Sequence, residues 1–168
     1  MGLAAFAARA AAAGVDGVLT LDVPVEESGD LRAALRGAGL DVVFLVSPTT
    51  TPARIRLAGE HGSGFLYAIS RLGVTGARAA LADGVADLVG RIRAVSDRPV
   101  AVGFGISTPG HVRDVCRTAD AAVVGSARVQ LIAEHGDAPD LARQVAAYVA
   151  WLKGAGAPPA VAAAPGRR

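Results

Sequence analysis

Three glycine-rich segments could bring the backbone close to an anionic ligand. They are Ser70–Ala77 (SRLGVTGA), Val102–Ser107 (VGFGIS) and Val124–Ala127 (VGSA), and each directly follows an apolar run. Glycine permits close approach of the backbone, and free N–H groups at the start of a helix favour negative charge. A lone glycine-rich turn more often only reverses the chain. Three in succession, each after a predicted strand, favour a phosphate-binding site.

Other kinds of site lack the residue spacing that they need. Gly103-Phe104-Gly105 continues as Ile-Ser-Thr, so it does not complete the G-x-G-x-x-G pattern of dinucleotide-binding proteins. Cys116 has no His or Asp pattern to activate it and is predicted to be a small buried residue of a helix. Asp22 ends a predicted strand, but no partner for it can be named. Neither a metal site nor a catalytic triad is predicted, because the histidines lack metal-ligand spacing and are predicted at the surface: His61, His111 and His135.

Short apolar, β-branched runs alternate with longer amphipathic stretches. Leu81, Val85, Leu88 and Ile92, for example, recur at helical spacing. This alternation indicates repeated βαβ units and a parallel sheet whose faces are covered. The spacing fits either an open doubly wound sheet or part of a (β/α)8 barrel, whose units average about 31 residues. The predicted strands are residues 17–21, 41–46, 64–69, 100–103 and 121–125.

The composition indicates one globular domain in a reducing compartment. The 168 residues are 52% hydrophobic and 19% charged, with one cysteine and a formal net charge of +2. The basic residues are scattered and no apolar run approaches the roughly 20 residues of a membrane span, so neither nucleic acid nor membrane is predicted as a partner. With no secretory cleavage pattern, a cytoplasmic location is predicted. A partial barrel domain is predicted over residues 1–153, followed by a disordered Gly/Ala/Pro tail over 154–168.

Several motifs together resemble one enzyme family. Gly14–Ser28 (GVDGVLTLDVPVEES) closely resembles the fourth strand and following loop of the tryptophan synthase α subunit family. Ser70–Ala77 resembles the sixth loop of that family, while Val100–Pro109 (VAVGFGISTP) and Val124–Ala127 resemble the ends of its seventh and eighth strands. The resemblance runs in order from about Leu3 to Lys153. GFGIS and GSA recur in several phosphate-binding barrels, so the combination of GVTGA with DVPVEES gives the resemblance its specificity.

The resemblance implies an α/β fold, a partial (β/α)8 TIM barrel with five parallel strands, the family's fourth to eighth. It implies a lyase of tryptophan biosynthesis that cleaves indole-3-glycerol phosphate to indole and glyceraldehyde 3-phosphate beside a β subunit. Pyridoxal phosphate belongs to that partner, so no cofactor is expected in this chain. The implied phosphate-binding residues are Gly76, Gly105, Gly125 and Ser126, and the implied substrate-pocket residues are Leu19, Tyr67 and Thr75. On its own, an aromatic such as Tyr67 on an apolar strand is more often part of a core.

No residue of this chain can be assigned the two catalytic carboxylates of the family. These are a glutamate in the second strand and an aspartate in the loop after it, whereas the resemblance begins in the helix before the fourth strand. General acid–base groups each supply about 10² to 10⁴-fold, so useful turnover by this chain alone is not expected. Two open sheet edges are expected to make the isolated chain aggregate, dimerise or stay partly molten. The alternative hypothesis is a non-catalytic phosphate-ligand-binding or interaction module derived from the same barrel.

Overall fold

The computed structural model describes residues 1–69, 78–103 and 105–156. Its five strands are β1 (Gly17–Leu19), β2 (Asp41–Val46), β3 (Leu66–Ile69), β4 (Val100–Gly103) and β5 (Ala121–Val123). The helices are α1 (Leu3–Ala12), α2 (Gly29–Gly37), α3 (Pro52–His61), α4 (Arg78–Arg93), α5 (Pro109–Val115), α6 (Ser126–His135) and α7 (Leu141–Leu152), with a 3₁₀ turn, η1 (Val25–Glu27). No helix among the described residues is both long and apolar enough to cross a membrane.

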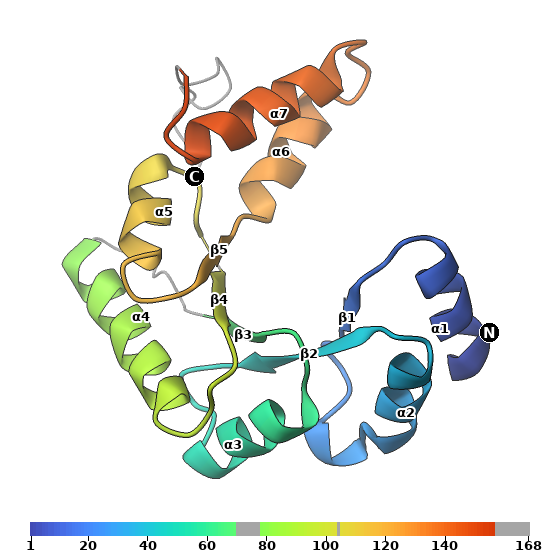
Figure 1. The fold of residues 1–168 in the computed structure, drawn as a ribbon. Coiled ribbons are helices and arrows are strands. Elements are labelled where there is room, and N and C mark those ends of the chain that lie inside the picture. The colour runs from blue at the N-terminus through green and yellow to red at the C-terminus, as the bar shows by residue number, and fades with distance from the viewer. Residues whose placement is uncertain (70–77, 104, 157–168) are drawn as a thin grey trace.

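The order of the strands distinguishes between the two architectures that the sequence allows. Each strand pairs in parallel with its neighbour along the chain, in the order β1-β2-β3-β4-β5. A doubly wound sheet would instead reverse its order at a switch point. The strands form an arc with α2, α3, α4 and α5 on its outer side, and the arc is open between β1 and β5 (Figure 1). The predicted partial barrel of five parallel strands is therefore confirmed.

Three strands are shorter than predicted. The predicted strand over residues 64–69 begins at Leu66 because Gly64 adopts a φ of +72°, which interrupts extended backbone. The last predicted strand ends at Val123, ahead of Gly125, whose φ of −105° and ψ of −81° are not those of a strand. The first ends at Leu19. Residues 157–168, most of the predicted tail, lie outside the described residues, and the disorder of that tail stays a prediction.

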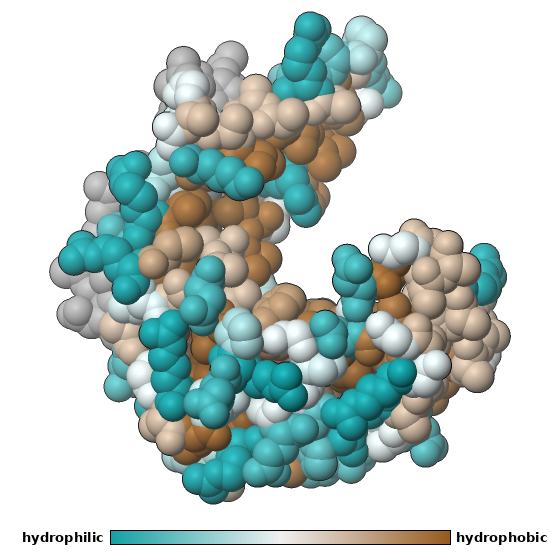
Figure 2. Space-filling view, viewed as in Figure 1, coloured by the Kyte–Doolittle hydropathy of each residue, from teal (hydrophilic) through white to brown (hydrophobic). Residues whose placement is uncertain are grey.

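The main core lies between the sheet and the outer helices. Phe44 and Leu66 of the sheet are fully buried together with residues from the surrounding helices, among them Leu35, Ile55, Leu88 and Ile92. Val85, Leu88, Val89 and Ile92 form the buried face of α4, as their spacing predicts. Hydrophobic side chains also gather on both sides of the opening of the arc (Figure 2). Large exposed ones include Leu3 and Phe6 of α1, Leu19 of β1, and Val129 and Ile132 of α6.

One carboxylate connects the starts of β4 and β5. Asp120 Oδ2 accepts a hydrogen bond of 2.8 Å from the Val100 N–H, and Oδ1 accepts one of 3.2 Å from Arg93. The Asp120 N–H in turn donates to the Val100 carbonyl oxygen at 2.9 Å. The Val100 N–H, and to a lesser extent Arg93, hold the pKa of Asp120 below its ordinary value of 3.8.

We expect Asp120→Asn to lower the free energy of unfolding at pH 7 by about 1 kcal/mol or less, because the carboxylate is half-exposed. The folded-state pKa lies below the unfolded one, so this stabilisation is present above pH 3.8 and disappears as the pH falls through the folded value. Urea unfolding at pH 7 and pH 3 measures it, with Asp114→Asn on the exposed face of α5 as the control. An equal loss at both pH values would contradict the assignment.

Candidate functional site

The predicted site residues lie at the carboxyl ends of neighbouring strands. Leu19 ends β1, Tyr67 lies within β3, and Gly105 follows β4. Gly125 and Ser126 follow β5, with Ser126 as the first residue of α6. Because all five strands are parallel, these carboxyl ends share one rim of the arc. Thr75 and Gly76, also predicted site residues, lie outside the described residues.

Tyr67 belongs to the inner face of the arc. Its neighbours Leu66 and Ala68 are fully buried in the main core, while Tyr67 itself is half-buried, as alternation along a strand requires. The ring lies against Gly103 of β4, where an added Cβ would be 2.7 Å from Cζ and 3.1 Å from Cε2 of Tyr67. Gly103 therefore provides the space that the Tyr67 ring occupies. This placement favours a lining residue over a residue of the main core.

We expect Gly103→Ala to lower the free energy of unfolding by about 1–3 kcal/mol, because the new methyl group must displace the Tyr67 ring. The ring signals of Tyr67 should shift in NMR spectra, and urea unfolding measures the stability.

Gly110→Ala in α5 is the matched control, since its Cβ would meet nothing closer than 3.7 Å and alanine favours a helix. If both variants left the Tyr67 signals and the unfolding free energy unchanged, the proposed close contact would be wrong.

The segment after β4 is held at several points. Gly105 has a φ of +73°, in the left-handed region that favours glycine, and the next side chain, Ile106, is 2% exposed. The Ser107 N–H donates to His111 Nδ1 at 3.3 Å. Thr108 then caps α5 by accepting from the His111 N–H at 3.2 Å, ahead of Pro109. The sequence predicted a surface position for His111, whereas the structure has it half-buried and hydrogen-bonded.

The segment after β5 presents the start of α6. Within the described residues no side chain caps this helix, whose N-cap is Gly125. A Cβ at Gly125 would meet no atom within 4 Å, so the space beside the first turn is open. The first N–H groups of a helix lack intrahelical partners and lie at the positive end of the helix dipole. The Gly125–Ser126 backbone can therefore bind an anion.

A hollow of about 280 Å³ lies at the ends of β1 and β2. Its lining includes Asp22, which is exposed, and Arg54, which forms an ion pair with Glu26 at 3.1 Å. Thr20 also lines it, and its buried hydroxyl has no hydrogen-bond partner within the described part of the chain. A buried hydroxyl of this kind is not visible from sequence, because its burial depends on the packing of the adjacent strand.

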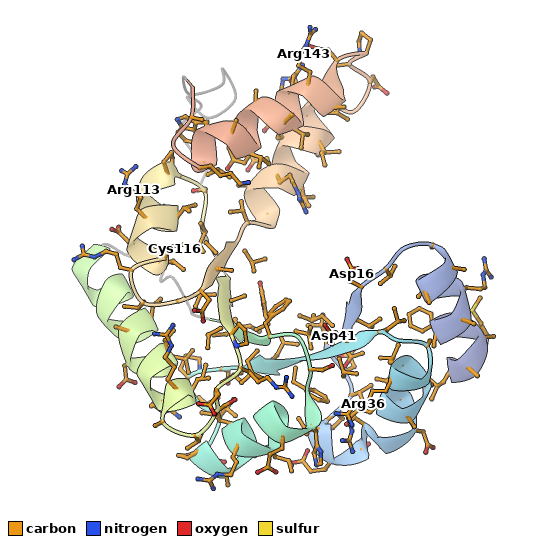
Figure 3. The ribbon with its side chains drawn as sticks, viewed as in Figure 1. Asp16, Arg36, Asp41, Arg113, Cys116 and Arg143 are labelled. Carbon is orange, nitrogen blue, oxygen red and sulfur yellow. The ribbon has the colours of Figure 1, made fainter. Side chains whose placement is uncertain are left out.

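A second, mainly apolar cavity of about 400 Å³ lies among α5, β5, α6 and α7. Cys116, at the end of α5, lines it and is exposed rather than buried, contrary to the sequence expectation (Figure 3). The buried residue in this part of α5 is Val115, whereas Cys116, the C-cap residue, lines the cavity and is open to solvent there. Across residues 1–69, 78–103 and 105–156, no three His, Cys, Asp or Glu side chains are grouped to hold a metal ion.

The comparisons with known proteins agree on one family. A family model described as "Tryptophan synthase alpha chain" matches residues 1–155. The tryptophan synthase alpha chain of Thioalkalivibrio sulfidiphilus is 50% identical over 145 residues, which are 86% of this chain and 54% of that protein. That of Solibacter usitatus is 46% identical over 152 residues, or 90% of this chain and 57% of that protein. The chain thus spans about half the length of these curated relatives.

Solved structures give the same result. A chain of the tryptophan synthase a2b2 complex of Pyrococcus furiosus superposes with a TM-score of 0.80 at 36% identity, covering 91% of this chain and 61% of that chain. A chain of tryptophan synthase from M. tuberculosis superposes with a TM-score of 0.75 at 36% identity, covering 91% and 55%. The partial barrel therefore has the fold of the corresponding part of these longer chains.

Proposed function

We propose, since this chain belongs to the tryptophan synthase alpha chain family, that it forms the phosphate-binding part of the lyase that cleaves indole-3-glycerol phosphate in tryptophan biosynthesis. The products of that reaction are indole and glyceraldehyde 3-phosphate. The observation that carries the proposal is the position of two glycine segments, after β4 and β5, at one rim of the arc. Phosphate sites in such barrels use the loops after the last two strands and a short extra helix.

The phosphate would be held by the backbone rather than by charged side chains. In the proposed site the N–H groups of Gly105, Gly125 and Ser126 donate to its oxygens, together with that of Gly76. The dipole of α6 adds attraction for the anion. The indole and glycerol parts would then lie along the inner face of the arc, against Leu19 and Tyr67, with Thr75 as the third pocket residue that the family resemblance implies.

The acid and base of the lyase reaction are proposed to lie outside this chain. No residue here matches the glutamate and aspartate that the family uses on the indole ring. Without a proton donor and acceptor at indole, binding the phosphate alone stabilises substrate and transition state alike. We therefore propose that this chain contributes substrate binding and orientation to the reaction.

The proposed partner is a tryptophan synthase β subunit in the cytoplasm. The Pyrococcus furiosus structure above is described as an a2b2 complex, and that description supports a β subunit as the partner. Pyridoxal phosphate would be held by that subunit, where it joins indole to serine. This chain is proposed to hold no cofactor of its own.

We expect Ser126→Asp to weaken the binding of glycerol 3-phosphate by tenfold or more. The new carboxylate would lie at the first turn of α6, where it repels the phosphate and competes for the same N–H groups. Isothermal titration calorimetry on the full chain measures the dissociation constant.

Ala133→Asp adds the same charge to an exposed position near the other end of α6 and serves as the control. Equal weakening by both variants would mean that net charge, rather than the start of α6, governs binding.

The alternative, a non-catalytic phosphate-ligand module, predicts binding without chemistry. With indole-3-glycerol phosphate as substrate, we expect indole release by the purified chain to stay at the uncatalysed rate, because two groups worth about 10² to 10⁴-fold each are absent. Both functions therefore predict binding of glycerol 3-phosphate without lyase activity by this chain alone. Association with an added β subunit, measured by analytical ultracentrifugation, favours the lyase part, and no association favours the module. If the wild-type chain fails to bind glycerol 3-phosphate, both functions are contradicted.

A further inference from the structure

Both backbone polar groups of Ser107 are held by side chains from two different helices. Its N–H donates to His111 Nδ1 of α5, and its carbonyl oxygen accepts a 2.9 Å hydrogen bond from the Tyr148 hydroxyl of α7. Ser107 is two residues beyond Gly105, within the segment proposed to bind phosphate. Tyr148 is 41 residues away in sequence, so this hydrogen bond is a tertiary tether.

Tyr148 also belongs to the cluster against which the second proposed phosphate-binding segment packs. It is 4% exposed and forms a small core with Leu131 of α6 and Leu152 of α7. Val124 and Ala127, the residues on either side of Gly125–Ser126, pack against this same cluster. The cluster that contains Tyr148 therefore lies against the residues flanking Gly125–Ser126, while the Tyr148 hydroxyl holds the loop after β4.

The environment of Tyr148 suits a fixed hydrogen-bond donor. Its ring pairs with that of Trp151 at a centroid distance of 5.8 Å, which restrains the ring on α7. Burial raises the pKa of its hydroxyl above the ordinary value of 10.0, so the hydroxyl stays protonated at neutral pH and can donate to Ser107.

The loop after β4 depends on such a tether because a glycine lies within it. Gly105 can leave its left-handed conformation at little cost, so the direction of its N–H is set by what holds the residues after it. The buried Ile106 side chain anchors the loop to the core, and the two hydrogen bonds of Ser107 fix the backbone orientation. Without the Tyr148 bond, the loop would keep its hydrophobic anchor and lose part of this orientation.

We propose that Tyr148 is a positioning residue for phosphate binding, holding Ser107 so that the Gly105 N–H and the start of α6 converge on one phosphate group. This inference rests on the proposed function, since it concerns the same site. Tyr148 itself would not touch the ligand.

The test is Tyr148→Phe in the full chain, which removes the hydroxyl and keeps the ring packing. We expect the dissociation constant of glycerol 3-phosphate to rise about three- to tenfold, the effect of losing one neutral hydrogen bond. Amide hydrogen exchange should accelerate at Gly105 and Ser107 but not in the middle of α6. Thr118→Val is the matched control, because it removes a hydroxyl that donates to the Val115 carbonyl oxygen at 3.3 Å, at the far end of α5.

The outcomes separate this inference from the proposed function. If the wild-type chain does not bind glycerol 3-phosphate, the proposed function fails and the positioning role fails with it. If the wild-type chain binds and Tyr148→Phe leaves both the dissociation constant and the exchange at Gly105 and Ser107 unchanged, only the positioning role is overturned. Uniformly faster exchange throughout α5, α6 and α7 would also overturn it, because it would indicate general destabilisation.

Discussion

Parallel pairing of each strand with its chain neighbour is the constraint on which the rest of the structure depends. With all strands parallel, every carboxyl end and the loop after it are at the same rim, and the helices between strands, α2 to α5, return along the outer side (Figure 1). Residues distant in sequence, from Leu19 to Ser126, are thereby placed around one edge. The residues of the proposed binding site therefore share one location.

Two kinds of contact then hold the residues at this rim in place. Close packing fits the Tyr67 ring into the space left by Gly103, which joins neighbouring strands on the inner face. Side chains from the outer helices hold the backbone after β4, through His111 and Tyr148. In the proposed site, the inner face would thus provide the shape for an apolar part of the ligand, and the outer helices would fix the direction of the N–H groups. The binding function proposed for this rim depends on both layers.

Local sequence patterns predicted the strands and helices better than they predicted the tertiary contacts between them. The five strands and the apolar stripe of α4 follow from local periodicity, and the glycine segments mark the rim because turns after strands need them. The Tyr148–Ser107 hydrogen bond joins residues 41 positions apart and has no local pattern. The exposure of Cys116 depends on the cavity that it lines among α5, β5, α6 and α7, and no local pattern predicts how these elements pack. Thr75 and Gly76 remain predictions from the family resemblance.

The two edge strands, β1 and β5, affect how this chain could associate with other molecules. β1 and β5 are only three residues long, so each offers few backbone groups to a further strand. The side chains next to them are apolar, with Val129 61% exposed on α6. Attachment of another molecule at the opening would therefore depend more on the burial of apolar side chains than on backbone hydrogen bonds. Because hydrophobic contacts weaken on cooling and strengthen in sulfate, an attachment of this kind would respond to temperature and salt in the same way.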